Sequence, residues 1–450
     1  MAAAVNARWV LEQECRALLT RLDRLDYFAV IEPMVAAAAP APEARVNIER
    51  FLFDGRRLMR HMVTSYLTSL RKPANRAAGP EELQRRFCYV RLRFNSLLSD
   101  FDTFSDVMTQ RSETPFGVWL AGLDVAATGA LQLPGSKVLL PPVVCYLDRG
   151  HGAAIRRART RLSTGRENPV AIIRVPRERM VGSGIAASLF HEVGHQAMSL
   201  LNLLPGLQQV LKAKQLLADS EKTAWMLWER WISEIAADFW AITHLGIGAT
   251  LGVFGVLSLP RAFVFRVDMA DPHPFPWVRA VLSCKLGEAL FPHSQWRRLE
   301  SVWRSFYPLG GLDPERLALV KLLEATMPEF IQLLMNHRVA SLDGRTVPEI
   351  LRHEERRPER LKMLFKRWRA RRGEILHVPP PLALAVLGQA KADFLLSPEE
   401  ETRAVLSLLR AWALQRTLSL TGSPHTKCNC RPRPVKRKPT LILQEGESHA

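Results

Sequence analysis

The chain has few cysteines for its length. Six cysteines in 450 residues are too few for a scaffold held together by disulfides, and four of them stand far apart. Only Cys428 and Cys430 are close, and one intervening residue is a poor spacing for a metal or redox pair. The N-terminal stretch also lacks a basic segment followed by an apolar core. We therefore expect buried thiols, no signal peptide and a cytoplasmic protein.

Lysine is scarce as well, although the chain is strongly basic. Of the 62 basic residues only 13 are Lys, and 44 acidic residues leave a formal charge of +18. The excess lies in three segments, 151–180, 351–373 and 427–440, which carry +6, +7 and +6, while the remaining residues together carry −1. We expect these segments to contact an acidic partner or a membrane surface. A zinc-finger pair, a Gly-rich phosphate loop and an aromatic RNA-binding motif are all missing, which disfavours a nucleic-acid-binding protein.

One apolar run, residues 241–260, is long enough to span a membrane in principle. It contains His244 and four glycines, and it has no Lys or Arg on the side of that histidine. Gly-rich segments also pack closely inside proteins. We therefore predict a buried helix or helical hairpin here rather than membrane association.

Hydrophobic spacing predicts an α+β fold that is mostly α. Apolar residues make up 47% of the chain and charged residues 24%, which is typical of a folded globular protein. The length of 450 residues predicts two or three domains. Helical spacing and helix-start signals alternate with two short β-branched segments. The predicted helices cover 47–70, 80–104, 183–205 and 220–246, with more after Asp313 and Ser397, and the predicted strands cover 138–148 and 168–178.

These elements divide the chain into four regions. We predict a helical N-terminal region over 1–132, a core with a small sheet over 133–310, a helical C-terminal region over 311–421 and a basic flexible tail over 422–450.

The predicted helix from Ser183 contains the sequence His-Glu-Val-Gly-His. Residues four apart lie on one face of a helix, so His191 and His195 can both point at one metal ion, and Glu192 can reach a water beside it. Zinc favours imidazole and carboxylate ligands and keeps an open position for water in catalytic sites. The alternative is a helix whose two histidines pack or hydrogen-bond without metal.

Two carboxylates follow on the next predicted helix. Glu234 and Asp238 are four residues apart and share a face among strongly apolar neighbours, where unpaired carboxylates are costly to bury. Glu234 as a zinc ligand and Asp238 as the hydrogen-bond partner of a ligating histidine would satisfy both groups. The alternative is a solvated acidic edge. Met198 and Leu201 stand where a metzincin requires Gly and His, so that class is excluded.

A third motif, residues 271–279, is a Pro-rich turn that leads into a helix. It presents His273 and Arg279 six residues apart, and either group near a reacting carbonyl could stabilise an oxyanion. The alternative is an ordinary surface turn.

Taken in this order, HExxH, ExxxD and HPxxxxR resemble the gluzincin zinc metallopeptidases, most closely the branch of the HtpX heat-shock proteases and the CAAX prenyl proteases. The resemblance covers about 100 residues, from the strand at 168 to the helix after Arg279. Unlike the membrane-embedded members of that branch, this chain shows no multi-span region around the motifs. The resemblance implies a zincin-like core with Zn²⁺ bound by His191, His195 and Glu234, with Glu192 as general base, Asp238 orienting a ligand, and His273 and Arg279 contacting the substrate or its oxyanion.

The resemblance thus implies a zinc-dependent endopeptidase that uses a metal-activated water on a protein or peptide substrate. Two alternatives stay open: a zinc hydrolase acting on a non-peptide amide, and a zinc-containing binding or scaffold protein with a vestigial site. We also expect the strand at 168–176 to be an edge on which an extended substrate pairs.

Overall fold

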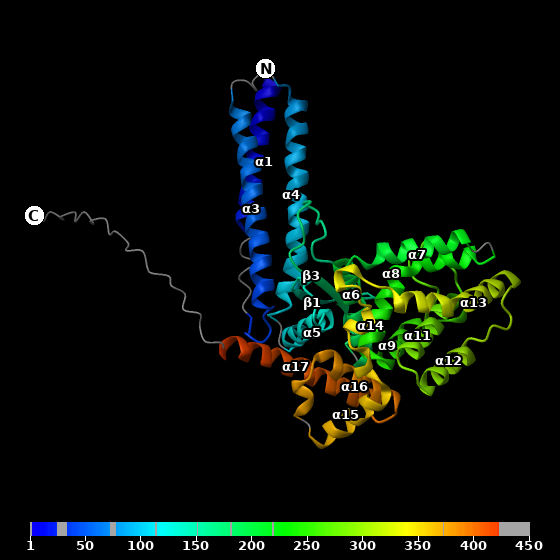
Figure 1. The fold of residues 1–450 in the computed structure, drawn as a ribbon. Coiled ribbons are helices and arrows are strands. Elements are labelled where there is room, and N and C mark those ends of the chain that lie inside the picture. The colour runs from blue at the N-terminus through cyan, green and yellow to red at the C-terminus, as the bar shows by residue number, and fades with distance from the viewer. Residues whose placement is uncertain are drawn as a thin grey trace, which may run out of the picture.

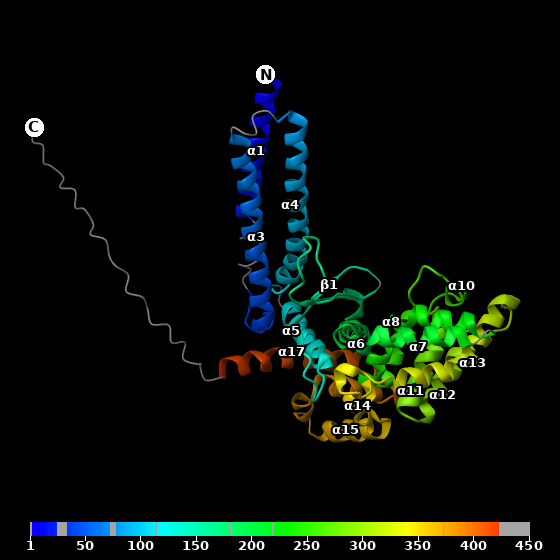
Figure 2. The ribbon, with the colours of Figure 1, turned by 45° about the horizontal axis from the view of Figure 1, so that its top comes forward.

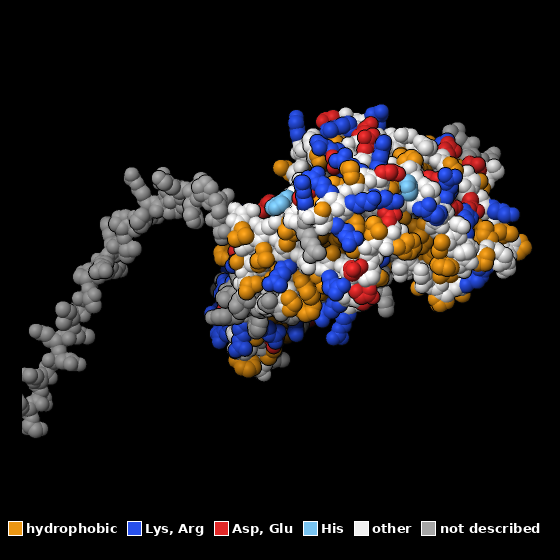
Figure 3. All heavy atoms as spheres, turned by 90° about the horizontal axis from the view of Figure 1, so that it is seen from below, with side chains coloured by type: hydrophobic (Ala, Val, Ile, Leu, Met, Phe, Trp, Pro, Cys, Tyr) orange, Lys and Arg blue, Asp and Glu red, His pale blue; other side chains and the backbone are white. Residues whose placement is uncertain are grey.

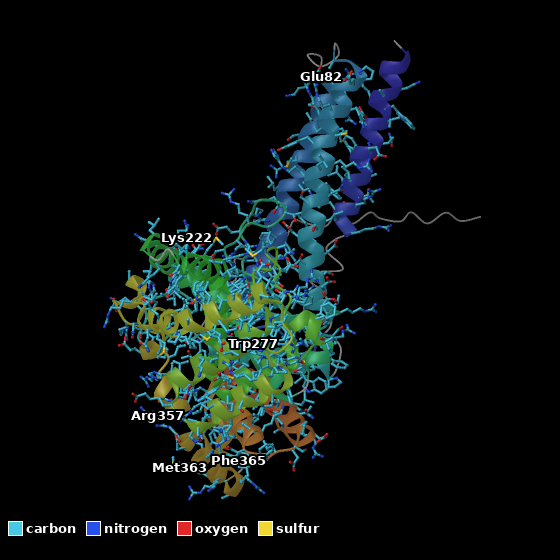
Figure 4. All side chains as sticks on the ribbon, turned by 90° about the vertical axis from the view of Figure 1, so that its right-hand side faces the viewer. Glu82, Lys222, Trp277, Arg357, Met363 and Phe365 are labelled. Atoms are coloured by element: carbon cyan, nitrogen blue, oxygen red, sulfur yellow. The ribbon has the colours of Figure 1, made fainter. Side chains whose placement is uncertain are left out.

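Three long helices at the start of the chain form a stalk that projects from the body (Figures 1 and 2). The computed structural model describes residues 2–24, 34–72, 78–112, 115–150, 152–180, 182–217, 220–371 and 373–422. The stalk consists of α1 (Ala2–Arg24), α3 (Pro42–Arg71) and α4 (Pro80–Thr109). Pro42 and Pro80 open their helices, where a missing N–H costs nothing. Figure 4 shows Glu82 near the far end of the stalk and Trp277 inside the body.

The body contains a three-stranded sheet with the order β1–β3–β2. Strands β1 (Val143–Asp148) and β3 (Ala171–Pro176) are parallel, and β2 (Ala154–Arg156) runs antiparallel to β3. Alternate side chains face opposite sides of a sheet. Accordingly Val144 and Ile172 pack on the base of the stalk, whereas Cys145 and Ile173 belong to the larger core of the body.

The order of the strands corrects one prediction. We expected 168–176 to be the edge on which a peptide pairs, but β3 is the central strand and has a neighbour on each side. The two edge strands are β1 and β2, and β2 has only three residues, too few to show the alternation of a strand in the sequence.

Helices make up the rest of the body, so the predicted α+β, mostly α class is confirmed. The remaining helices are α5 (Phe116–Leu131), α6 (Gly182–Leu201), α7 (Leu203–Leu217), α8 (Lys222–Leu245), α9 (Ile247–Leu257), α10 (Arg261–Val264), α11 (Pro276–Leu290), α12 (Ser294–Phe306), α13 (Pro314–Asn336), α14 (Val347–Ile350), α15 (Pro358–Ala370), α16 (Pro380–Ala392) and α17 (Pro398–Gly422). Short 3₁₀ turns cover η2 (Arg177–Arg179), η3 (Ala340–Leu342), η4 (His353–Arg356) and η5 (Glu374–His377).

The body has one continuous core, which includes residues from α5 through α17. Helix α5 lies inside the predicted N-terminal region 1–132, yet it packs in this core rather than in the stalk. The reason is its composition, because α5 is apolar on nearly every side while the stalk helices are amphipathic. The predicted C-terminal region 311–421 shares the same core, and the tail after 422 lies outside the described residues.

The predicted helix 183–205 ends earlier than expected. Helix α6 stops at Leu201, Asn202 takes a left-handed conformation with φ 50°, and α7 begins at Leu203. Pro205 therefore lies in the first turn of α7, where proline is tolerated, and does not terminate the preceding helix.

The apolar run 241–260 forms a mostly buried pair of helical segments joined at Gly246, in agreement with the predicted helical hairpin. It contains the end of α8, a reversal at Gly246 with φ 55°, and α9, and most of its side chains are buried. Within the described ranges, no helix combines the length and the apolar character that a membrane span requires.

Part of the basic charge is used inside the molecule. In segment 151–180 Arg166 donates a hydrogen bond to a backbone carbonyl of α3, and in segment 351–373 Arg356 donates one to a carbonyl of α8. On the face shown in Figure 3, Lys and Arg side chains are interspersed with acidic and apolar ones. Segment 427–440 lies outside the described residues.

A buried histidine makes the fold sensitive to acid. The ring of His244 lies edge-on to Phe190 and Trp240 at 5.6 and 5.3 Å, and its Nε2 has no hydrogen-bond partner among the described residues. Burial, together with the positive charge of Arg356, lowers the pKa of His244 to about 3. Below the ordinary pKa of about 6.5, the unfolded chain therefore binds a proton that the folded chain does not.

We expect His244 to reduce the free energy of unfolding by up to about 1.4 kcal/mol for each pH unit between 6.5 and 4.5. Urea unfolding of metal-free wild type and His244→Met at pH 7.5, 6.5, 5.5 and 4.5 measures this slope. The variant should lose less stability with acid, and equal slopes would show that His244 is not buried in its neutral form.

Candidate metal centre

Helices α6 and α8 cross at close range and bring their motifs together. A Cβ on Gly194 would lie 2.9 Å from Cα of Ala237, closer than real Cβ atoms approach backbone, and 3.0 Å from Cβ of Trp240, which is also a tight contact. The glycine of the HExxH sequence is therefore what lets the two helix backbones meet. This contact aligns His191 and His195 on α6 with Glu234 on α8.

Three imidazoles converge on one carboxylate oxygen. Oε2 of Glu234 lies 3.2 Å from Nε2 of His191 and 3.3 Å from Nε2 of His195. Nε2 of His273, in the turn before α11, lies 3.0 Å from the same oxygen. The ligand atoms of His191, Glu234 and His273 all lie within 4.8 Å of one another.

The outer nitrogens of two of these rings also face carboxylates. Nδ1 of His191 is 2.7 Å from Oδ1 of Asp238, and Nδ1 of His273 is 2.7 Å from Oδ1 of Asp271. A carboxylate only accepts, so each Nδ1 donates a proton. A neutral ring then turns the lone pair of its Nε2 toward Glu234, whereas a protonated ring donates a second N–H to it. The lone pair of an Nε2 atom and the negative oxygen of Glu234 repel each other unless a proton or a metal ion lies between them.

The donor set fits zinc. Imidazole nitrogens and a carboxylate oxygen are the ligands that Zn²⁺ takes in catalytic sites, and carboxylates behind the histidines are their usual supports. Ligand atoms at about 2.0–2.1 Å from a tetrahedral ion lie about 3.3 Å apart. The separations of 3.0 to 3.3 Å between Oε2 of Glu234 and the three Nε2 atoms agree with that value. His195 is not a member of the group whose ligand atoms all lie within 4.8 Å of one another.

The pKa values of the cluster also favour positive charge next to Glu234. Burial alone would raise the pKa of Glu234, but hydrogen bonds from His191, His195 and His273 hold it well below its usual range. Burial would likewise lower the pKa of His191, whereas the hydrogen bond and charge of Asp238 raise it to about 9. In the absence of a metal ion, the cluster therefore retains protons.

Asp238 and Arg279 form a buried pair behind the cluster. Nε of Arg279 donates to Oδ2 of Asp238 at 2.7 Å, and Nη2 donates to Oδ1 at 2.8 Å. Burial favours the protonated form of Asp238, but the charge and hydrogen bonds of Arg279 keep its pKa well below the ordinary value. Asp238 is therefore ionised and can hold the ring of His191 in one orientation.

Glu192 lies at the wall of a cavity of about 360 Å³ that opens beside the cluster. Glu192 is only 7% exposed, and burial raises its pKa above the ordinary value. His191, His273 and Arg279 line the same cavity, whose other wall is apolar and comes mainly from α9. A larger cavity of about 800 Å³ between α5, α17 and η5 contains no residue of the cluster.

All seven residues predicted from the sequence lie at this centre, but two have environments that the motifs did not reveal. Arg279 contacts Asp238 rather than presenting a free guanidinium to the cavity. His273 reaches Glu234 directly, which makes it a fourth candidate ligand besides the predicted set.

Sequence reasoning missed Asp271. Its carboxylate accepts two hydrogen bonds from His273, one from the backbone N–H and one from Nδ1 of the ring. An Asp two residues before a His, in a Pro-rich turn, is the available signal, since Asp commonly bonds the backbone two residues on.

Comparisons with known proteins do not identify the chain. No protein-family model, no curated protein and no solved structure matches it. The resemblance to zinc metallopeptidases therefore rests on the three sequence motifs alone.

Proposed function

We propose that this protein is a zinc-dependent endopeptidase with a zincin-like core. The observation that carries the proposal is the convergence of three Nε2 atoms on Oε2 of Glu234, beside a buried Glu192 at a cavity. A vestigial or purely structural site has no need of a base at that position.

The residues that would hold zinc are His191, His195 and Glu234, with His273 as a further candidate ligand. A bound zinc ion would supply Lewis-acid polarisation of a carbonyl and would lower the pKa of water to about 7. Asp238 fixes the tautomer and the orientation of His191, and Arg279 keeps Asp238 ionised.

Glu192 acts as the general base. Its carboxylate accepts a proton from the attacking water and then delivers that proton to the leaving amine nitrogen. The raised pKa of the buried carboxyl group suits both steps, because such a group takes up and releases protons closer to neutral pH. His273, which is more exposed than the other histidines of the cluster, is placed to contact the substrate when it is not a ligand.

The substrate in this proposal is an extended peptide. Gly152 and Ala153, immediately before the edge strand β2, line the cavity, so a peptide pairing with β2 would pass along the cluster. The apolar wall formed by Ala249, Gly252 and Val253 accepts an uncharged side chain next to the scissile bond.

A peptide library with free N-termini blocked tests the function. Zinc-loaded protein should generate new N-termini detectable by mass spectrometry, and the chelator 1,10-phenanthroline should abolish them until zinc is restored. Cleavage of amide-bearing small molecules but no peptide would favour the non-peptide hydrolase. Stoichiometric zinc without any hydrolysis would favour the binding or scaffold protein.

A further inference from the structure

The loop between β2 and β3 is a small hairpin that is fastened to the stalk. Within the hairpin, the N–H of Arg159 donates to the carbonyl of Asn168 at 2.9 Å, and the N–H of Leu162 donates to that of Arg166 at 2.8 Å. Gly165 provides the left-handed residue of the turn with φ 80°. Leu162 is buried in the core of the stalk, so the hairpin packs there rather than projecting into solvent.

Asp100 of α4 holds the tip of the hairpin. Its carboxylate accepts hydrogen bonds from the N–H of Ser163 at 3.0 Å, the N–H of Thr164 at 3.2 Å and the hydroxyl of Thr164 at 2.6 Å. Asp100 is only 1% exposed. A buried carboxylate that accepts three hydrogen bonds from one turn fixes that turn strongly.

Arg166 holds the returning arm of the hairpin to α3. Its Nη1 donates to the carbonyl of Phe51 at 2.7 Å, and its guanidinium lies 4.0 Å from the centre of the Phe51 ring. A Cβ on Gly55 would come within 2.9 Å of the same Nη1, so the glycine leaves the space that the guanidinium occupies.

The other end of the hairpin is joined to α6, the helix that carries His191 and His195. The N–H of Ala158 donates to Oε1 of Gln196 at 2.8 Å, and Gln196 is the neighbour of His195 on α6. The side chain of Asn168 donates to the carbonyls of Arg156 and Arg157 at 3.1 Å, which braces the end of β2. The residues immediately before β2 line the cavity beside Glu192.

We propose that Asp100 and Arg166 are positioning residues through which the stalk sets the substrate-binding edge of the proposed peptidase. The stalk holds the hairpin, the hairpin holds β2, and the two residues before β2, Gly152 and Ala153, line the cavity. The proposal rests on the proposed function for its substrate. The coupling between the stalk and β2 is a property of the chain itself and can be measured without any substrate.

Asp100→Asn tests the coupling, with Asp102→Asn as the matched control. Asp102 is exposed on the same helix, so the control makes the same charge change away from the hairpin. Hydrogen exchange of residues 152–158 in the full chain should be about tenfold faster in Asp100→Asn than in the control. The reason is that the weakened hydrogen bonds of residue 100 to Ser163 and Thr164 no longer restrain local opening. Zinc content should be equal in both proteins.

Kinetics separate positioning from general destabilisation. On a peptide that wild type cleaves, Asp100→Asn should raise KM about tenfold while kcat stays within about threefold. If Asp100→Asn fails to unfold cooperatively, Arg166→Met replaces it in the same comparison.

Equal exchange of residues 152–158 in variant and control would overturn the proposal, as would a fall in kcat at unchanged KM. If wild type cleaves no peptide, the proposed function fails, and the exchange measurement alone still decides whether the stalk positions β2.

Discussion

Glu192→Gln should retain zinc and lose about 10²–10⁴-fold in kcat/KM. Gln keeps the shape of the side chain but cannot accept a proton, and Glu192 lies beside the cluster at the cavity rather than among the atoms that converge on Glu234. The substitution therefore removes the base and leaves the candidate ligands in place.

The measurement is kcat/KM on a cleaved peptide, together with zinc content by mass spectrometry. Glu229→Gln is the matched control, because Glu229 lies on α8 with its side chain 21% exposed and pairs with Lys212. Activity within tenfold of wild type would rule out Glu192 as the base. Loss of zinc from the variant would show instead that Glu192 is a ligand.

Asp238→Ala should destabilise the metal-free protein by about 3–5 kcal/mol, because it leaves the buried guanidinium of Arg279 without its partner. It should also weaken zinc binding about 10–100-fold, since His191 loses the carboxylate that orients it. Urea unfolding and a competitive zinc titration measure the two effects.

Asp271→Ala is the control for stability. The Asp271 side chain is 52% exposed, and such a pair contributes about 0–1 kcal/mol. If Asp238→Ala costs no more than Asp271→Ala, the pair with Arg279 is not the buried support that the structure describes.

The sequence was sufficient to predict the helices α3, α4 and α8 and the helical spacing of the two histidines. Helices α3 and α4 could be predicted because their apolar spacing and their first-turn prolines depend only on neighbouring residues. The structure has both helices where this spacing predicts them. The spacing of His191 and His195 is likewise local, because it needs only one helix turn.

The parts that could not be predicted depend on distant contacts. Strand β2 forms because it pairs with β3, and its three residues are too few to show the alternation of apolar and polar residues that predicts a strand. The role of Arg279 depends on Asp238, 41 residues earlier, and the approach of His273 to Glu234 depends on the path of the turn before α11. Helix α5 joined the body rather than the stalk because its apolar surface needed covering on several sides.

Anomalous scattering at the zinc absorption edge locates zinc in crystals of the zinc-loaded protein and so tests the metal site directly. We expect a single strong peak among Nε2 of His191, Nε2 of His195 and Oε2 of Glu234, and the distance of His273 from that peak shows whether it is a ligand. A protein that takes up no zinc, or a peak elsewhere in the chain, would contradict this expectation.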